Sequence, residues 1–125
     1  PKAFPDTVAK GAHTIDIHQV DSIDQNEFVL LRRPYNVPFR CLVPQGSVNV
    51  VTAGRCLDAD GPGFGSVRVM ATCMAMGQGS GTAAALAVRE GIAIPELDGP
   101  LLRETLAEQG AIVDFSNVTA LAVEN

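Results

Sequence analysis

The longest uncharged stretch of the chain, Met70 to Val88, constrains the fold most strongly. Its nineteen residues are long enough to cross a membrane as a helix. However, it contains polar residues such as Gln78 and Ser80 together with three glycines, and Leu86 is its only large branched aliphatic residue before Val88. Its mean hydropathy is therefore too low for a membrane span, and we predict a helix buried within a folded domain.

The ends and one face of this helix can also be predicted. We place it from about Val69 to Glu90, followed by Gly91 in the left-handed conformation that often ends a helix. Small residues recur every four positions at Gly77, Gly81 and Ala85, which makes one face flat and lets another backbone approach closely. We expect this helix to pack hard against a sheet.

The segments on either side of the helix predict a mixed α/β or α+β fold. The apolar run 48–53, which ends at Gly54, is typical of a strand buried on both faces of a parallel sheet. A glycine-rich loop is expected from Arg55 to Gly65. A second helix is expected from about Pro100 to Gln109, with Gly110 ending it.

The remaining segments predict shorter elements. The alternation in Thr14–His18 predicts a strand with Ile15 and Ile17 on one face and Asp16 and His18 on the other. Pro38 indicates an edge strand or a bulge. The other expectations are an arm over 1–12, strands over 28–32 and 37–42, and a last strand over 118–123.

Charge and cysteine content exclude several classes of function. Nine basic and 14 acidic residues give a net charge of −5, and the sequence has no cluster of Lys and Arg. Both features argue against a nucleic acid or an anionic membrane as a partner. Cys41, Cys56 and Cys73 match neither a disulfide framework nor a zinc knuckle, which favours a reducing, cytoplasmic location. Asp58 and Asp60 have no third carboxylate at metal-ligand spacing, so no metal site is expected.

The chemistry most strongly indicated by the residues themselves is an anion site. A strand that leads through glycines to a helix N-terminus presents backbone N–H groups and a positive partial charge to a ligand. Arg55 and Arg68 flank this point. Glycine loops also serve as plain turns, and both interpretations stay open. The run Gly77–Gly81 has the wrong spacing for a dinucleotide fingerprint.

Four blocks of sequence, in order, resemble one family. They are Val37–Pro44, Asn49–Cys56, Gly65–Gln78 and Gly81–Ala87, and Gly11–His18 resembles the segment that precedes them. The family is the bacterial FAD-dependent oxidoreductases of the glutathione-reductase-like superfamily, whose members are sometimes labelled xanthan lyases. The resemblance covers about residues 4–110.

The resemblance implies that this is the C-terminal part of a flavoenzyme that lacks its N-terminal phosphate loop. Residues 1–46 would end a substrate domain, 47–110 would belong to the FAD domain, and 111–125 would form a tail. The turn Ala53–Arg55 would lie by the FAD pyrophosphate. The segment Gly65–Met70 would run beneath the isoalloxazine, and the helix start near Met70 would point at flavin N1 and O2. The implied cofactor-binding residues are Ala53, Gly54, Arg55, Gly65, Ser66, Val67, Arg68, Val69, Met70 and Ala71.

The catalytic candidates are His18 and Arg68. Asp16 could orient the His18 imidazole as a base, although such a pair is also common on a solvated strand face. The loop 60–64 lacks the His or Glu that members of the family often carry there.

Together, these features predict a segment that completes the flavin site and part of the pocket for an unidentified small-molecule substrate, without turnover by itself. Its partner would be the missing Rossmann portion, or another chain that carries it. The alternatives are a remnant that binds a small anion or nucleotide, and a piece that docks on another subunit through Gly77, Gly81 and Ala85, including a second copy of itself.

Overall fold

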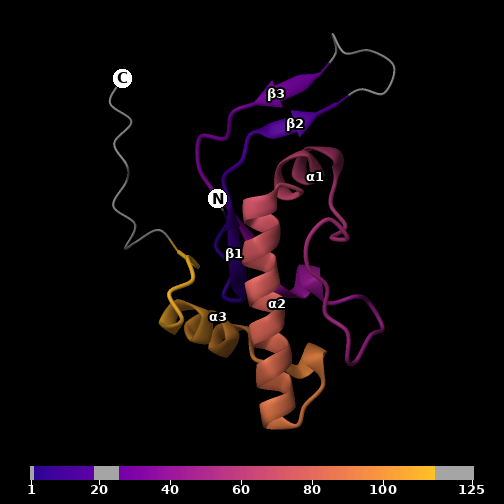
Figure 1. Cartoon of the computed structure of the whole chain (residues 1–125), viewed down its shortest axis with the longest axis vertical. Helices are drawn as coiled ribbons and strands as arrows, with labels where there is room; N and C mark the ends of the chain where they lie inside the picture. The colour runs from indigo at the N-terminus through magenta and orange to yellow at the C-terminus, as the bar shows by residue number, and fades with distance from the viewer. Residues whose placement is uncertain (1, 19–25, 115–125) are drawn as a thin grey trace.

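The structure, a computed structural model, describes residues 2–18 and 26–114 of the chain (Figure 1). Its described part contains three α-helices and two small antiparallel sheets, which confirms the mixed α/β class. In chain order the elements are β1 (Thr7–Gly11), β2 (Ile15–Ile17), β3 (Glu27–Val29), β4 (Tyr35–Pro38), η2 (Phe39–Leu42), α1 (Gly61–Val67), α2 (Met70–Glu90), η3 (Ile94–Glu96) and α3 (Gly99–Glu108).

The long helix α2 runs through the middle of the molecule (Figure 1). The prediction of its two ends is confirmed: it spans Met70–Glu90, and Gly91 follows with φ of 66° and an N–H group that bonds to the carbonyls of Ala87 and Val88. Its buried residues are Thr72, Met76, Gly79, Ser80, Ala83, Leu86 and Ala87. These residues form one stripe along the helix, which packs against β1 and α3.

The close backbone approach on α2 occurs at Gly79 and not at the predicted stripe. A Cβ atom on Gly79 would lie 2.9 Å from Cβ of Val8, whereas one on Gly77 or Gly81 would meet nothing within 4 Å. Gly77, Gly81 and Ala85 are exposed. The expectation that this stripe packs against a sheet is therefore wrong for the described chain, because β1 contacts the opposite side of the helix.

A matched pair of alanine substitutions distinguishes these two sides of α2. We expect Gly79→Ala to lower the free energy of unfolding by about 1–2 kcal/mol, because Val8 and β1 must shift. Gly81→Ala is expected to raise it by about 0.5–1 kcal/mol, because alanine favours the helix and the site is open. Urea unfolding followed by circular dichroism measures both values. Equal effects of the two substitutions would contradict this packing.

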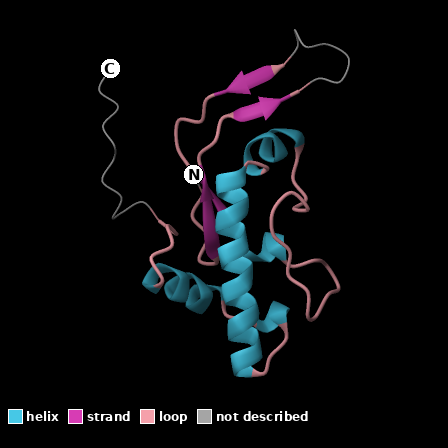
Figure 2. Cartoon of the chain, in the orientation of Figure 1, coloured by secondary structure: helices cyan, strands magenta, loops and turns pink. Residues whose placement is uncertain are grey.

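The first sheet pairs β1 with β4, and it corrects the prediction of an N-terminal arm. Thr7, Val8 and Ala9 are buried, and β1 lies alongside α2 (Figure 2). The register shifts between Thr7 and Ala9, opposite Pro38 and Val37, which confirms the bulge that Pro38 indicated. The arm prediction failed because a five-residue strand that contains Lys10 and Gly11 shows no clear alternation.

The segment 48–53 forms no strand, so that prediction is wrong. Its backbone is bonded to several different elements: Thr52 N–H donates to the Leu42 carbonyl at 2.7 Å, and the Val48 carbonyl accepts from Ile94 N–H at 2.9 Å. The Thr52 carbonyl also accepts from Ser80 Oγ at 2.5 Å. An apolar run becomes a strand only beside another strand, and no such neighbour lies next to it among the described residues.

The helix α1 lies at the end of the predicted loop 55–65 and was missed. It begins after Asp60, whose side chain accepts a hydrogen bond from Gly63 N–H, and Pro62 lies in its first turn. The second sheet, β2 with β3, lies beside α1 at one end of α2 (Figure 2).

The helix predicted over 100–109 is confirmed as α3, and Gly110 follows it with φ of 82°. Its buried residues Leu102 and Leu106 lie on one face of the helix.

The strands predicted over 28–32 and 37–42 are shorter or displaced, because β3 ends at Val29 and residues 39–42 form the 3-10 helix η2. The predicted strand over 118–123 lies outside the described residues.

Candidate functional site

The contact between α1 and β2 forms the base of the candidate site. A Cβ atom on Gly65 would lie 2.9 Å from the carbonyl oxygen of Asp16, so only glycine lets the two backbones come this close. The adjacent Ser66 hydroxyl lies 2.5 Å from the carbonyl oxygen of His13, to which it donates, and 3.0 Å from the Tyr35 hydroxyl. Gly65, Ser66 and Val67 are all buried, so this part of the predicted flavin segment holds β2 in place.

The two predicted catalytic residues, His18 and Arg68, meet on one carboxylate. Nη2 of Arg68 donates to Oδ2 of Asp16 at 3.2 Å and to the Asp16 carbonyl oxygen at 3.1 Å. Nε2 of His18 lies 2.9 Å from Oδ1 and 3.0 Å from Oδ2 of the same aspartate. The Asp16 side chain is only 20% exposed, so it is a partly enclosed anion between two basic groups.

The His18 ring is the exposed member of this cluster, with 56% of its side chain accessible. Phe28 on β3 meets it edge to face, with 6.1 Å between the ring centroids. Among the described residues, Nδ1 of His18 makes no hydrogen bond. Asp16 therefore holds one ring nitrogen, and the described residues leave the other without a hydrogen bond.

The start of α2 presents free hydrogen-bond donors. Its N-cap residue, Val69, provides no side-chain acceptor, and no acidic residue lies in the first turn. The amides of Met70, Ala71 and Thr72 precede the first intrahelical bond, which Cys73 N–H makes to the Val69 carbonyl at 3.0 Å. Within the described part of the chain these amides have no partner. Val69 is half-buried, whereas Met70 and Ala71 are exposed.

The turn Ala53–Arg55 lies next to this helix start. Gly54 has φ of 84°, and a Cβ atom built on it would lie 3.9 Å from Cβ and Sγ of Cys73 in the first turn of α2. Ala53 is half-buried and Arg55 is exposed. The structure thus brings the 53–55 turn, one of the two predicted cofactor segments, beside the beginning of α2.

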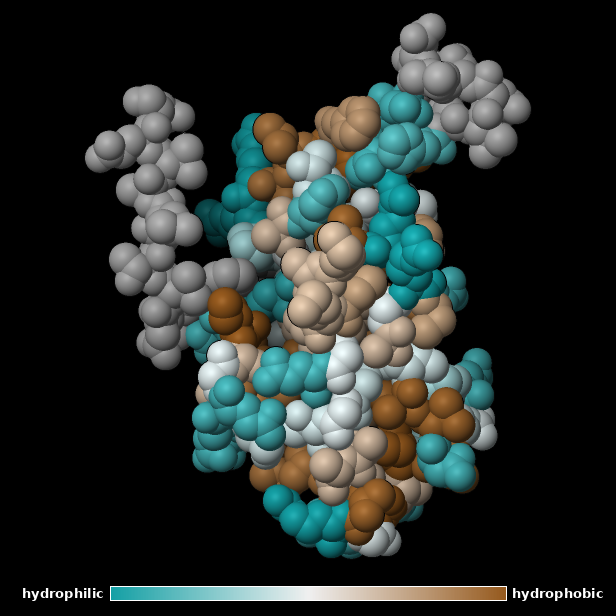
Figure 3. All heavy atoms as spheres, viewed as in Figure 1, coloured by the Kyte–Doolittle hydropathy of each residue, from teal (hydrophilic) through white to brown (hydrophobic). Residues whose placement is uncertain are grey.

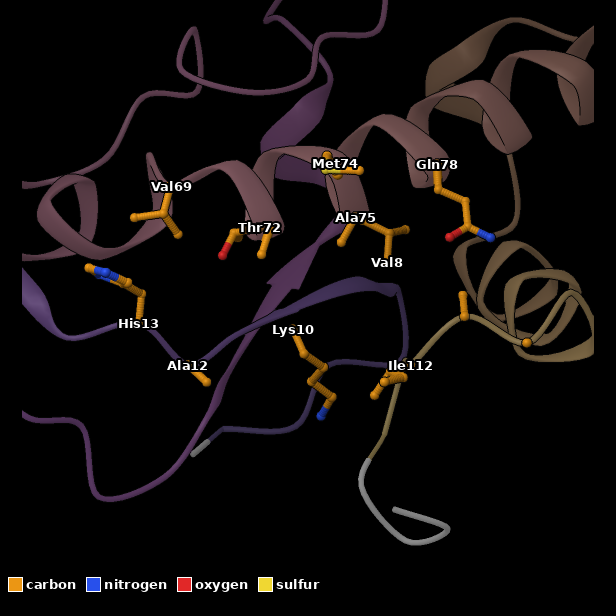
Figure 4. A pocket seen from close by; sticks show the side chains of 13 residues that line it. Val8, Lys10, Ala12, His13, Val69, Thr72, Met74, Ala75, Gln78 and Ile112 are labelled. Atoms are coloured by element: carbon orange, nitrogen blue, oxygen red, sulfur yellow. The ribbon is translucent and has the colours of Figure 1, made fainter. Parts of the chain in front are cut away.

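An open groove of about 680 Å³ lies along the N-terminal half of α2 (Figure 4). It is lined mainly by apolar groups, among them Val69 and Ala71 of the predicted cofactor set. Its polar lining side chains are Lys10, His13, Thr72 and Gln78. Sequence reasoning missed Lys10 because it did not predict β1, and the other three because position in the sequence alone does not show what faces a groove.

Lys10 lies at the edge of this groove, within the influence of two charged side chains. Burial lowers its pKa, Asp114 acts in the opposite direction, and Arg103 adds to the lowering. Arg103 is itself paired with Asp114, with Nη2 3.0 Å from Oδ2. This edge of the groove is therefore a shared charge network that links β1 with the segment after α3.

The three cysteines are unpaired, and Arg40 takes part in a salt bridge. Cys41, Cys56 and Cys73 are free thiols, and burial raises the pKa of Cys41. Nη1 of Arg40 lies 2.6 Å from Oδ1 of Asp6, so this arginine forms a salt bridge. Within residues 2–18 and 26–114, no three His, Cys, Asp or Glu side chains come together as a metal-binding group.

One face of α2 is both apolar and exposed. Met70, Met74 and Val88 are 83%, 75% and 84% accessible, and the small residues Gly77, Gly81 and Ala85 lie between them. In Figure 3 a pale brown and white band runs down the middle of the molecule, where α2 lies in Figure 1. We call these six residues the apolar face of α2.

In the described part of the chain, no helix is both long and apolar enough to cross a membrane.

Comparison with known proteins identifies the family. No curated protein and no solved structure matches the chain. Residues 1–106, however, match the family described as FAD dependent oxidoreductase, so the match includes the Asp16 cluster, the 53–55 turn and α2. The family name specifies the cofactor, which is FAD. The chain belongs to the FAD dependent oxidoreductase family.

Proposed function

We propose that this chain completes the flavin site of an FAD-dependent oxidoreductase, with the N-terminus of α2 directed at the N1–C2=O edge of the flavin. The three unpaired amides of Met70, Ala71 and Thr72 are the observation that carries this proposal. Reduced flavin bears negative charge at that edge, and a helix N-terminus stabilises a neighbouring anion.

The residues present fit FAD. The helix start offers only donors and has no acidic side chain in its first turn, which suits an acceptor that becomes anionic. Gly54 in the neighbouring turn has no Cβ and adopts a positive φ, so a phosphate or ribityl chain can approach its backbone. Ala53, Gly54 and Arg55 would hold that chain. When bound, FAD supplies the hydride chemistry.

Within the second predicted segment, the residues divide into two groups. Val69, Met70 and Ala71 would contact the flavin, while Gly65, Ser66 and Val67 would fix the backbone that leads to them by packing on β2. Arg68 lies between the groups and reaches Asp16. We therefore place His18 and Arg68 beside the flavin, on the substrate side.

The part that carries the nucleotide-binding phosphate loop would dock on the apolar face of α2. Apolar groups continue beside this face at Val48, which is 64% exposed and lines a groove together with Val88. An exposed apolar surface of this kind marks an interaction site.

Titration of FAD with the purified chain, followed by flavin fluorescence, tests whether FAD binding depends on the part that carries the phosphate loop. We expect no quenching with the chain alone at tens of micromolar, and saturable quenching once the N-terminal portion of the flavoprotein is added. Saturable quenching by the chain alone would overturn the dependence. The absence of quenching in both cases would overturn the flavin site.

A charge placed in the first turn of α2 tests the helix start directly. In the assembled flavoprotein, Ala71→Glu should lower the flavin midpoint potential by about 20 mV relative to Ala71→Gln, because about 1 kcal/mol of repulsion destabilises the reduced anion. The same glutamate should raise the free energy of unfolding of the chain by about 0.3–1 kcal/mol through the helix dipole. Equal potentials in the two variants would contradict the proposed orientation.

A further inference from the structure

We infer that Asp16 is a positioning residue that holds His18 as the Nε2–H tautomer, so that Nδ1 exchanges a proton with the substrate, and that Arg68 acts through Asp16. The inference deepens the proposed function and rests on it for the identity of the reaction. The assignment of the tautomer depends only on the geometry of this chain.

The contact between His18 and Asp16 decides which nitrogen carries the hydrogen. Nε2 lies 2.9 Å and 3.0 Å from the two oxygens of a carboxylate, which can only accept a hydrogen bond. Nε2 must therefore be the donor. In a neutral imidazole the other nitrogen then has a free lone pair, and Nδ1 has no partner among the described residues.

Three contacts keep the carboxylate and the ring in this arrangement. Arg68 bonds to both the side chain and the backbone carbonyl of Asp16, which fixes the position of the aspartate and balances its charge. The backbone at Gly65 packs directly on Asp16. Phe28 packs edge to face with the His18 ring, and this contact restricts the rotation of the ring.

The cluster lies at the place where a proton acceptor is needed. Arg68 is the residue that follows α1, and Met70 begins α2 two residues later, so the cluster is joined directly to the proposed flavin contact. In the step assigned to His18, the bond between a substrate heteroatom and its hydrogen breaks. The electron pair stays on the heteroatom, and the proton goes to Nδ1. The resulting imidazolium is stabilised by Asp16.

Nitrogen NMR of the chain tests the tautomer, and the chain contains its own control. It has two histidines. Nδ1 of His13 lies 2.7 Å from the Thr14 carbonyl oxygen, which can only accept, so His13 should be the Nδ1–H tautomer. We expect opposite tautomers for the two neutral histidines in one long-range proton–nitrogen spectrum. An Nδ1–H tautomer at His18 would overturn the inference.

Asp16→Asn is the informative substitution. Arg68 requires an acceptor, so the single oxygen of Asn should face Arg68 and its NH₂ group should face His18. The His18 tautomer should then invert to Nδ1–H while His13 is unchanged. In the assembled flavoprotein, the same variant should lower kcat by about 100-fold or more with little change in KM.

The outcomes separate this inference from the proposed function. An unchanged His18 tautomer in Asp16→Asn would overturn the positioning role, whether or not the chain contributes to a flavin site. An inverted tautomer with unchanged kcat in a protein that binds FAD would overturn the proton exchange. Failure of the FAD titration would overturn the flavin proposal and leave the tautomer result intact.

Discussion

Leu102→Ala is expected to lower the free energy of unfolding by about 2–5 kcal/mol, which is a large part of the stability of a domain of this size. Leu102 on α3 is completely buried. Its helix packs against both α2 and β1, so the cavity would open between three elements. Truncating a buried leucine removes its transfer free energy and its contacts with the surrounding side chains.

The neighbouring residue provides the control for this substitution. Leu101 is 37% exposed on the same helix, and Leu101→Ala should cost less than about 1 kcal/mol. Chemical unfolding of the three proteins, with circular dichroism as the probe, gives both differences. Similar losses for the two variants would contradict the position of α3 against the core.

The helices α2 and α3 could be predicted from sequence because their signals are local. Gly91 and Gly110 adopt the positive φ angles that their positions after α2 and α3 indicated. Pro100 lies in the first turn of α3 as expected. Each of these signals involves residues within a few positions of one another, so no knowledge of the tertiary contacts was needed.

The elements that were missed or misplaced depend on partners far away in the sequence. β1 is a strand because β4 pairs with it, and the run 48–53 is not a strand because nothing described pairs with it. The helix α2 has glycines on two sides, Gly77 and Gly81 on one and Gly79 on the other. Only the position of β1 shows that Gly79 is the buried glycine.

The candidate site shows the same division. The alternation in β2 correctly placed Asp16 and His18 on one face, and their contact is observed. Arg68 was selected separately, for its position in the family segment. Its bond to Asp16 joins residues 52 positions apart, and it depends on α1, which the glycine-rich sequence did not predict.

Gly65→Ala is expected to separate β2 from α1 and to lower the free energy of unfolding by about 3 kcal/mol. The added Cβ atom would lie 2.9 Å from the Asp16 carbonyl oxygen and 3.3 Å from its carbonyl carbon and amide nitrogen. These are backbone atoms, which cannot rotate away as the end of a side chain can. The strand must therefore move, and the bonds from Arg68 to Asp16 should break.

Gly61→Ala in the same helix is the matched control, because a Cβ atom there meets nothing within 4 Å. We expect it to leave the free energy of unfolding unchanged or to raise it by up to about 1 kcal/mol. Urea unfolding gives the stabilities, and the nitrogen spectrum of His18 reports on the cluster. If Gly65→Ala kept both the stability and the Nε2–H tautomer, the close contact at Asp16 would not exist. Loss of both in Gly65→Ala alone would show that the contact between α1 and β2 is what holds Asp16 beside His18 and Arg68.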